Sequence, residues 1–389
     1  MNFGLDERER AWRDEVRDFA DGVSGDDMLE IRRETARLDV ERHSRTFYEK
    51  LARRGWVGLG WPEPYGRPVT ETDRFVLHEE LDTAGLPMYG VEINEAIGWM
   101  LARHGSDELR AEHLPHIVAG TRWYAGGYSE PEAGSDLLAL RTRAVRDRDT
   151  FRVSGSKLWT SSAHLADFIF AIVRTDADAE RHRGLSMILI DTSLPGVDIT
   201  PVRVMGGWRV NLCFFDDVVV PAGNVIGAVD EGWTVLSEAL DVERAMSFGG
   251  REGRLWMARF LHRRAGRGGE MADADLEAIG RFVMDLEVER LLGLRLAAMG
   301  ERGAIANAEA SMAKVFGSEL AQRLVAWLAD RAGPEALFEE RRGEPAGDQF
   351  AADMEEALRA ATVYTVIGGT SEVQRNTVAG RGLRLPRER

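Results

Sequence analysis

The sequence changes its periodicity twice, and this limits the possible folds more than any other feature. In residues 1–121 apolar positions such as Trp12 and Val16 recur at helical spacing between charged ones, which predicts amphipathic helices. In residues 122–232 short β-rich runs alternate with Gly, Pro and Asp, which predicts an antiparallel β-domain. In residues 233–389 the helical period returns. The order of helices, strands and helices indicates an α+β multi-domain protein and argues against a doubly wound parallel sheet.

Several boundaries can be predicted within these three parts. Residues 97–119 form one amphipathic segment in the first part. In the last part a long helix should begin at the acidic pair Asp273 and Asp275, and a further helix should cover 305–329. The segment 333–349 is rich in Gly, Pro and charge, which is typical of a loop. A last helix from about residue 351 should break at a Gly-Gly pair.

The charge balance excludes one class of function. The chain of 389 residues has 50 Lys and Arg against 65 Asp and Glu, a formal net charge of −15, whereas sequence-independent nucleic-acid binding requires clustered cations. The single cysteine, Cys213, excludes an internal disulfide and is typical of a reducing compartment. The first residues lack the apolar core of a signal peptide, and no apolar run is long enough to cross a bilayer. We therefore expect a soluble, cytoplasmic protein without nucleic-acid or membrane partners.

The first of three unusual segments spans residues 128–137, Tyr-Ser-Glu-Pro-Glu-Ala-Gly-Ser-Asp-Leu. Pro131 and Gly134 favour a turn whose backbone N–H groups approach a ligand closely. Ser129 and Ser135 can donate hydrogen bonds. The alternative is a tight turn capped by Asp136.

The second segment spans residues 155–163, Gly-Ser-Lys-Leu-Trp-Thr-Ser-Ser-Ala. Trp159 stands beside a cluster of hydroxyls at an expected strand end, which suits a planar cofactor because the ring covers it and the hydroxyls reach its heteroatoms. The alternative is a β-turn with a half-buried tryptophan.

The third segment spans residues 367–376, Ile-Gly-Gly-Thr-Ser-Glu-Val-Gln-Arg-Asn. Gly368 and Gly369 followed by Thr370 at a helix start can form an anion-binding nest with a side-chain cap. The alternative is an ordinary helix break with an N-cap.

Two other kinds of site are not supported. Gly58-Leu59-Gly60 lacks the third glycine and the strand-turn-helix context of a Rossmann fingerprint. His113 and His116 lie three residues apart without a further ligand at metal spacing, so we expect a surface pair and no metal site.

The three segments, in this order and spacing, together with the run from Phe214 to Pro221, resemble the acyl-CoA dehydrogenase family over essentially the whole chain. The resemblance implies a fold that ends in a four-helix bundle, bound FAD, and α,β-dehydrogenation of an acyl-CoA. It also implies a homodimer or tetramer that passes electrons to an electron-transfer flavoprotein. Residues 374–387 are similar to actinobacterial members.

The resemblance assigns the flavin ring to the first two segments. Tyr128 and Ser129 would contact the flavin, Trp159 would lie against the isoalloxazine, and Ser161 would hydrogen-bond near N5, the hydride acceptor.

The remaining binding residues also follow from the resemblance. Gly369, Thr370 and Glu372 would hold the ribityl-pyrophosphate part of FAD. Ser135 would contact the pantetheine of CoA, and Arg244 would lie on the substrate side.

The catalytic base is expected at Glu243. Many family members carry a Glu where this chain has Gly368, but branches similar to isovaleryl-CoA and long-chain acyl-CoA dehydrogenases place it on an earlier helix, in a context like the Leu-Asp-Val-Glu-Arg of residues 240–244. Helical spacing also places Glu243 on one face with Leu236 and Leu240. Burial of this carboxylate would raise its pKa towards the range of a general base. The alternative is a helix–helix ion pair.

The implied reaction uses these residues together. Glu243 removes the α-proton while the β-hydride passes to flavin N5, and the Gly368 backbone N–H stabilises the developing enolate. Two family motifs that reach FAD across subunits are absent: an Arg-x-x-Phe-Gly motif, near residues 260–269, and a Gln-x-x-Gly-Gly motif, at Gly333-Pro334. Two alternatives therefore stay open, a non-catalytic or obligate hetero-oligomer partner subunit, and a flavin oxidase or monooxygenase.

Overall fold

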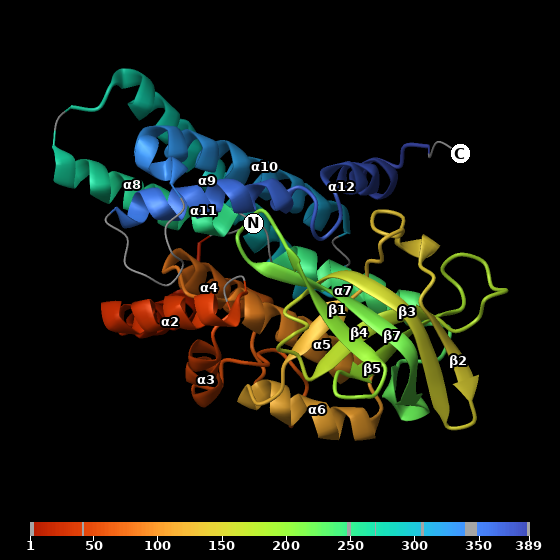
Figure 1. Cartoon of the computed structure of the whole chain (residues 1–389). Helices are drawn as coiled ribbons and strands as arrows, with labels where there is room; N and C mark the ends of the chain where they lie inside the picture. The colour runs from red at the N-terminus through yellow and green to blue at the C-terminus, as the bar shows by residue number, and fades with distance from the viewer. Residues whose placement is uncertain are drawn as a thin grey trace.

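Three groups of elements, in chain order helical, β and helical, make up the computed structural model of the chain (Figure 1). It describes residues 4–40, 43–246, 250–268, 270–304, 307–338 and 348–386, and the side chains of these outside 241–251. The sheet lies beside the N-terminal helices, and the long C-terminal helices form a layer over both (Figure 1).

The N-terminal group consists of six helices. They are α1 (Glu7–Asp21), α2 (Gly25–Leu38), α3 (Arg45–Arg53), α4 (Glu71–Thr83), α5 (Tyr89–His104) and α6 (Asp107–Ala119). Most begin at a Ser, Thr or Asp whose side chain accepts a backbone N–H of the first turn, as at Ser24 and Thr70. The prediction of one segment over 97–119 was wrong. Extended Gly105 ends α5, and Ser106 caps a new helix.

The middle group is a sheet that is mainly antiparallel, as predicted. Its strands are β1 (Tyr124–Gly127), β2 (Arg143–Asp147), β3 (Thr150–Ser161), β4 (Phe168–Arg174), β5 (Leu185–Asp191), β6 (Val197–Arg203), β7 (Arg209–Pro221) and β8 (Val225–Ile226). The order is β6-β7-β3-β2-β4-β5-β8, and β1 pairs with β4. The β1–β4 pair is parallel, which antiparallel hairpin logic did not predict. The long connection between these two strands, which holds β2 and β3, makes this pairing possible.

The C-terminal group is built around one central helix. The helices are α7 (Gly232–Met246), α8 (Gly250–Arg267), α9 (Asp273–Gly300), α10 (Asn307–Ala332), α11 (Gln349–Tyr364) and α12 (Ser371–Thr377). Helix α10 packs against α8, α9 and α11, which gives the expected four-helix bundle. Its positions Leu320, Leu324 and Leu328 are fully buried at four-residue steps. The segment expected as a loop starts with a short 3-10 turn, Pro334–Leu337, and its part at 339–347 lies outside the described residues.

Helix α7 lies where the three groups meet. It packs against α5, against β4 and β5, and against α10 (Figure 1). A side chain at Gly232 would come within 2.5 Å of the Ser186 backbone, so only glycine lets the helix start so close to β5. Leu236 is fully buried in a core cluster that includes Met187 and Ile97. The fold therefore holds one end of α7 firmly between helices and sheet.

None of the helices in the described ranges is both long and apolar enough to span a membrane.

Candidate functional site

The first and second segments lie against each other. The Lys157 ammonium donates to the Tyr128 carbonyl at 3.0 Å, and the Leu158 N–H donates to the Ser129 carbonyl at 2.9 Å. Residues that are about thirty positions apart in the sequence thus form one unit at the end of β3. The fold brings Tyr128 and Ser129 next to the strand that carries Trp159.

A buried ion pair fixes this unit, and sequence reasoning missed it. Glu130 and Lys157 are 2.8 Å apart, with side chains 7% and 0% exposed. The Glu130 carboxylate also accepts the backbone N–H groups of Arg141 and Thr142 at 2.7 and 3.0 Å. A carboxylate that ties three chain segments together gives the first segment a structural role as well as a binding role. The alternation of β3 was the available signal, because it places Lys157 on the buried face.

The two partners titrate in opposite senses to their burial. Burial alone would raise the pKa of Glu130, but the Lys157 charge and the hydrogen bonds to the carboxylate outweigh it and lower the pKa. For Lys157 burial dominates over the attraction of Glu130 and lowers its pKa to about 8. The pair is therefore ionised at neutral pH in a site where each charge depends on the other.

Trp159 is displayed to the outside of the sheet. Its backbone has a φ of +64°, its side chain is 56% exposed, and it lies in a register shift between Lys157 and Thr160. A bulky residue in the left-handed region costs about 1 kcal/mol or more. The alternative of a half-buried tryptophan in a β-turn does not fit this exposure. Strain that presents an aromatic ring to the surface is typical of a functional position.

Ser161 ends β3 and meets the N-terminal helices. It is partly buried, and the Tyr89 hydroxyl lies 3.4 Å from its Oγ. The next residue, Ser162, is buried and has a φ of +58°.

The turn of the first segment is closed by its backbone. The N–H and carbonyl groups of Glu130 and Ala133 bond to each other in both directions, at 2.9 and 3.1 Å. Asp136 precedes a short 3-10 turn but makes no capping hydrogen bond, so the alternative of a turn capped by Asp136 is wrong. Ser135 is exposed on this loop, where it is open to a ligand.

The third segment combines the nest and the cap. Gly368 and Gly369 have φ values of +62° and +92°, and Thr370 caps α12 by accepting the Val373 N–H. The Gln374 amide donates to the Gly368 carbonyl at 2.7 Å. This segment packs on α10, beside the bundle, rather than on the loop of the first segment (Figure 1).

The charge of Glu372 is stabilised at the start of α12. Its side chain is exposed, and its own backbone N–H and the Thr370 hydroxyl lower its pKa.

The residues of these segments fit a flavin dinucleotide. The buried atoms Ser371 Oγ and Gln374 Oε1 have no hydrogen-bond partner within the described part of the chain. Buried polar atoms without partners are costly unless a ligand or water satisfies them. Beside them is a glycine nest of the kind that binds phosphate, and on β3 is an outward-facing aromatic ring.

The expected base lies on α7, but its side chain does not belong to the described part. The backbone of α7 extends through Glu243 and Arg244, whose side chains are among those left out. The expectation that Glu238 faces away from the apolar side agrees with its contacts, because it lies 3.0 Å from His104 and 3.3 Å from Arg103.

The expectation of a surface histidine pair was wrong. His113 is buried, and its Nδ1 lies 2.8 Å from the Tyr124 hydroxyl. His116 is exposed and bonds to Thr121. Across the described residues there is no group of His, Cys, Asp and Glu that could hold a metal ion.

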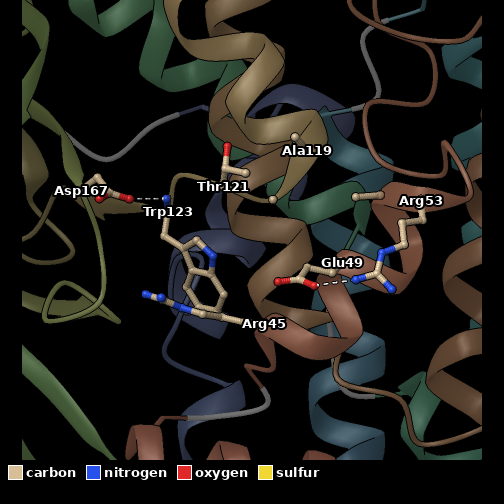
Figure 2. Close-up of a pocket in the computed structure, with 9 residues that line it drawn as sticks. Arg45, Glu49, Arg53, Ala119, Thr121, Trp123 and Asp167 are labelled. Carbon is tan, nitrogen blue, oxygen red and sulfur yellow. Dashed lines mark hydrogen bonds and ion pairs between the residues drawn. The ribbon is translucent and has the colours of Figure 1, made fainter.

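A cavity of about 420 Å³ opens between α3, the end of α6 and the start of β1 (Figure 2). The Arg45 guanidinium lies over the Trp123 ring at 5.0 Å, and Asp167 accepts the Trp123 backbone N–H at 2.8 Å. Glu49 and Arg53 form an ion pair 2.9 Å long at its edge. None of the residues from the three segments lines this cavity, so it is a separate feature.

Comparison with known proteins matches three domains of one family. The acyl-CoA dehydrogenase N-terminal domain matches residues 6–121, the middle domain 125–218 and the C-terminal domain 230–383.

Relatives of known sequence cover most of the chain. Acyl-CoA dehydrogenase FadE26 of Mycobacterium tuberculosis is 35% identical over 87% of this chain and 87% of its own length. Acyl-CoA dehydrogenase FadE29 of the same organism is 33% identical over 100% and 99%.

Solved structures match the whole fold. A structure titled "Tcur3481-Tcur3483 steroid ACAD" has a TM-score of 0.89 and 31% identity, with 100% of both chains covered. The ChsE4-ChsE5 complex of Mycobacterium tuberculosis has a TM-score of 0.86 and 29% identity, also over 100% of both chains. The chain therefore belongs to the acyl-CoA dehydrogenase family of flavoprotein oxidoreductases that act on CH–CH bonds.

Proposed function

We propose that the chain catalyses FAD-dependent α,β-dehydrogenation of an acyl-CoA, with Glu243 as the catalytic base. The observation that carries this proposal is the place of α7, which is held between α5, the sheet and α10. A helix in that position can deliver a carboxylate to a site bounded by all three groups. The left-handed glycine at 368 leaves no carboxylate at the commoner base position.

The proposed roles follow from the chemistry of an acidified α-carbon. Glu243 takes the α-proton, and the Gly368 N–H donates to the thioester carbonyl, where negative charge develops. When bound, FAD accepts the β-hydride at N5. Trp159 covers the flavin ring, and Tyr128, Ser129 and Ser161 set its position. Ser135 and Arg244 hold the CoA side of the substrate.

The other end of the cofactor is assigned to α12. We propose that Gly369, Thr370 and Glu372 lie along the ribityl-pyrophosphate. The positive φ of Gly369 and the helix start at Ser371 support binding of phosphate there.

We further propose a ring-containing acyl group and a partner chain. The solved structures with the similarity described above carry the words "steroid ACAD" and a complex of two differently named chains in their titles. The absence of the two sequence motifs that reach FAD across subunits supports a partner that supplies them. The electron acceptor is an electron-transfer flavoprotein, and the compartment is the cytoplasm, in which the buried Cys213 stays a thiol.

The test is flavin content and flavin bleaching. The chain is purified alone and after co-expression with the related chain encoded nearest to it, and bound FAD is measured by absorbance. Each preparation is then mixed without oxygen with straight-chain, branched and steroid-side-chain acyl-CoA thioesters. Bleaching by a steroid thioester supports the whole proposal, and bleaching by a straight chain alone contradicts the ring-containing substrate.

Two outcomes would favour the alternative functions. Flavin that no acyl-CoA bleaches in either preparation would indicate a non-catalytic subunit. Stoichiometric oxygen consumption during turnover would indicate an oxidase or monooxygenase, whereas turnover only with an artificial acceptor removes that alternative.

A further inference from the structure

Two aromatic residues of the N-terminal group meet the hydroxyls at the end of β3. The Tyr89 hydroxyl lies 3.4 Å from Ser161 Oγ. The Ser162 hydroxyl lies 3.2 Å from Nε2 of His43 and 3.4 Å from its Nδ1. We call Tyr89 and His43 together the N-terminal brace.

The brace is a packed unit of its own. The rings of His43 and Tyr89 meet edge to face, with centroids 5.6 Å apart. A side-chain carbon at Gly90 would come within 2.4 Å of the His43 ring, so a glycine at the start of α5 is what lets this ring lie there. The other side of the His43 ring faces Trp123 at 5.2 Å. His43 is buried, and α5 begins at Tyr89, so both rings have little freedom.

The hydroxyl chemistry gives the contact a direction. A serine hydroxyl has one proton to donate and two lone pairs that accept. The Tyr89 hydroxyl donates to Ser161 Oγ, and the proton of Ser161 is then directed to another acceptor. A donated hydrogen bond also polarises the hydroxyl and makes it a stronger donor.

We infer that Tyr89, held in place by His43, is a positioning residue that directs the Ser161 proton to the flavin ring. This inference rests on the proposed function, which places Ser161 beside flavin N5. The brace joins the helical group to the strand end, so the packing of one domain sets a hydrogen bond in the other. His43 holds Ser162, the residue after Ser161, and so limits how far the strand end can turn.

The test compares Tyr89→Phe with wild-type protein after loading with FAD. The variant keeps the ring against His43 and removes only the hydroxyl. We expect an altered visible absorption band of the bound flavin, a lower midpoint potential, and flavin reduction by substrate that is slower by about tenfold, the factor that corresponds to one hydrogen bond. The unfolding temperature of the flavin-free variant should stay near that of the wild type.

Two controls separate positioning from general damage. Tyr124→Phe also removes a tyrosine hydroxyl bond, the one 2.8 Å from His113, and should leave the spectrum and the potential unchanged. In a Ser161→Ala background, Tyr89→Phe should produce no further shift in potential, because the acceptor of its proton is gone.

Each outcome decides the question. Flavin-loaded Tyr89→Phe protein with the wild-type spectrum and potential would overturn the inference and leave the proposed function standing. A shift of equal size in the presence and absence of Ser161 would also overturn it. Wild-type protein that binds no FAD, alone or with a partner chain, would overturn the proposed function and this inference with it. A spectral shift without any substrate turnover would support the brace and contradict the proposed reaction.

Discussion

Removal of the cation from the buried Glu130–Lys157 pair should destabilise the protein strongly. In Lys157→Met the Glu130 carboxylate, 7% exposed, would remain in the core without its counter-ion. Two backbone N–H groups at 2.7 and 3.0 Å point at this carboxylate and oppose its protonation. Breaking a buried pair in this way costs about 3–5 kcal/mol.

A second substitution should restore part of the loss. Lys157→Met combined with Glu130→Gln leaves no buried charge, so we expect the double variant to be more stable than Lys157→Met alone by about 1–2 kcal/mol. The matched control is Lys50→Met. Lys50 and Asp27 are also 2.8 Å apart, but their side chains are 30% and 40% exposed, so the midpoint of unfolding should hardly move.

Urea unfolding at pH 7.5, followed by circular dichroism, measures these differences. With a slope of about 3 kcal/mol per molar urea, the loss in Lys157→Met corresponds to a midpoint lower by roughly 1 M or more. The reasoning is refuted if Lys157→Met and Lys50→Met shift the midpoint equally. It is also refuted if Glu130→Gln adds a further loss to Lys157→Met.

Three further predictions concern single positions. Burial would lower the pKa of His78, but two carboxylates of α5 raise it to about 9, so its contribution of about 3 kcal/mol should be complete below pH 6.5 and disappear as the pH rises to 9; unfolding measured across this range should lose most of that slope in His78→Gln. Trp159→Gly should relieve the left-handed strain and hold or raise the free energy of unfolding by about 1 kcal/mol, while FAD titration shows weaker binding; unchanged FAD affinity would contradict the role of the ring. Gly369→Ala, with φ +92° and a new carbon 2.7 Å from the Gln374 amide, should lose about 1–3 kcal/mol in urea unfolding, whereas Gly223→Ala, which meets nothing within 4 Å, should lose little.

Much of the fold could be predicted because its pattern is local. The start of α9 at Asp273 and the bounds of β5 follow from charge at a helix start and from an apolar run. The parallel β1–β4 pair could not be predicted, because Tyr124–Gly127 is too short to show a period and its partner lies forty residues away. The break at Gly105 was overlooked because apolar residues continue in helical phase on both sides of it.

The site was predictable where a residue type carries its own constraint. The glycines at 368 and 369 have the left-handed backbone that their place before a helix suggested. The buried pair of Glu130 with Lys157 and the contact of Tyr89 with Ser161 each join residues that are far apart in the sequence. Such contacts arise from the packing of domains, which no spacing within one segment encodes.

The reaction of Glu243→Gln protein with acyl-CoA is the most direct test of Glu243 as the base. FAD-loaded wild type and variant are mixed with the same thioester in the absence of oxygen, and flavin absorbance is followed in a stopped-flow instrument. The wild type should bleach within seconds, and the variant should keep its FAD and bleach slower by about 10³-fold or more, because no other carboxylate replaces the base. Bleaching of the variant at a rate within tenfold of the wild type would contradict the assignment of Glu243.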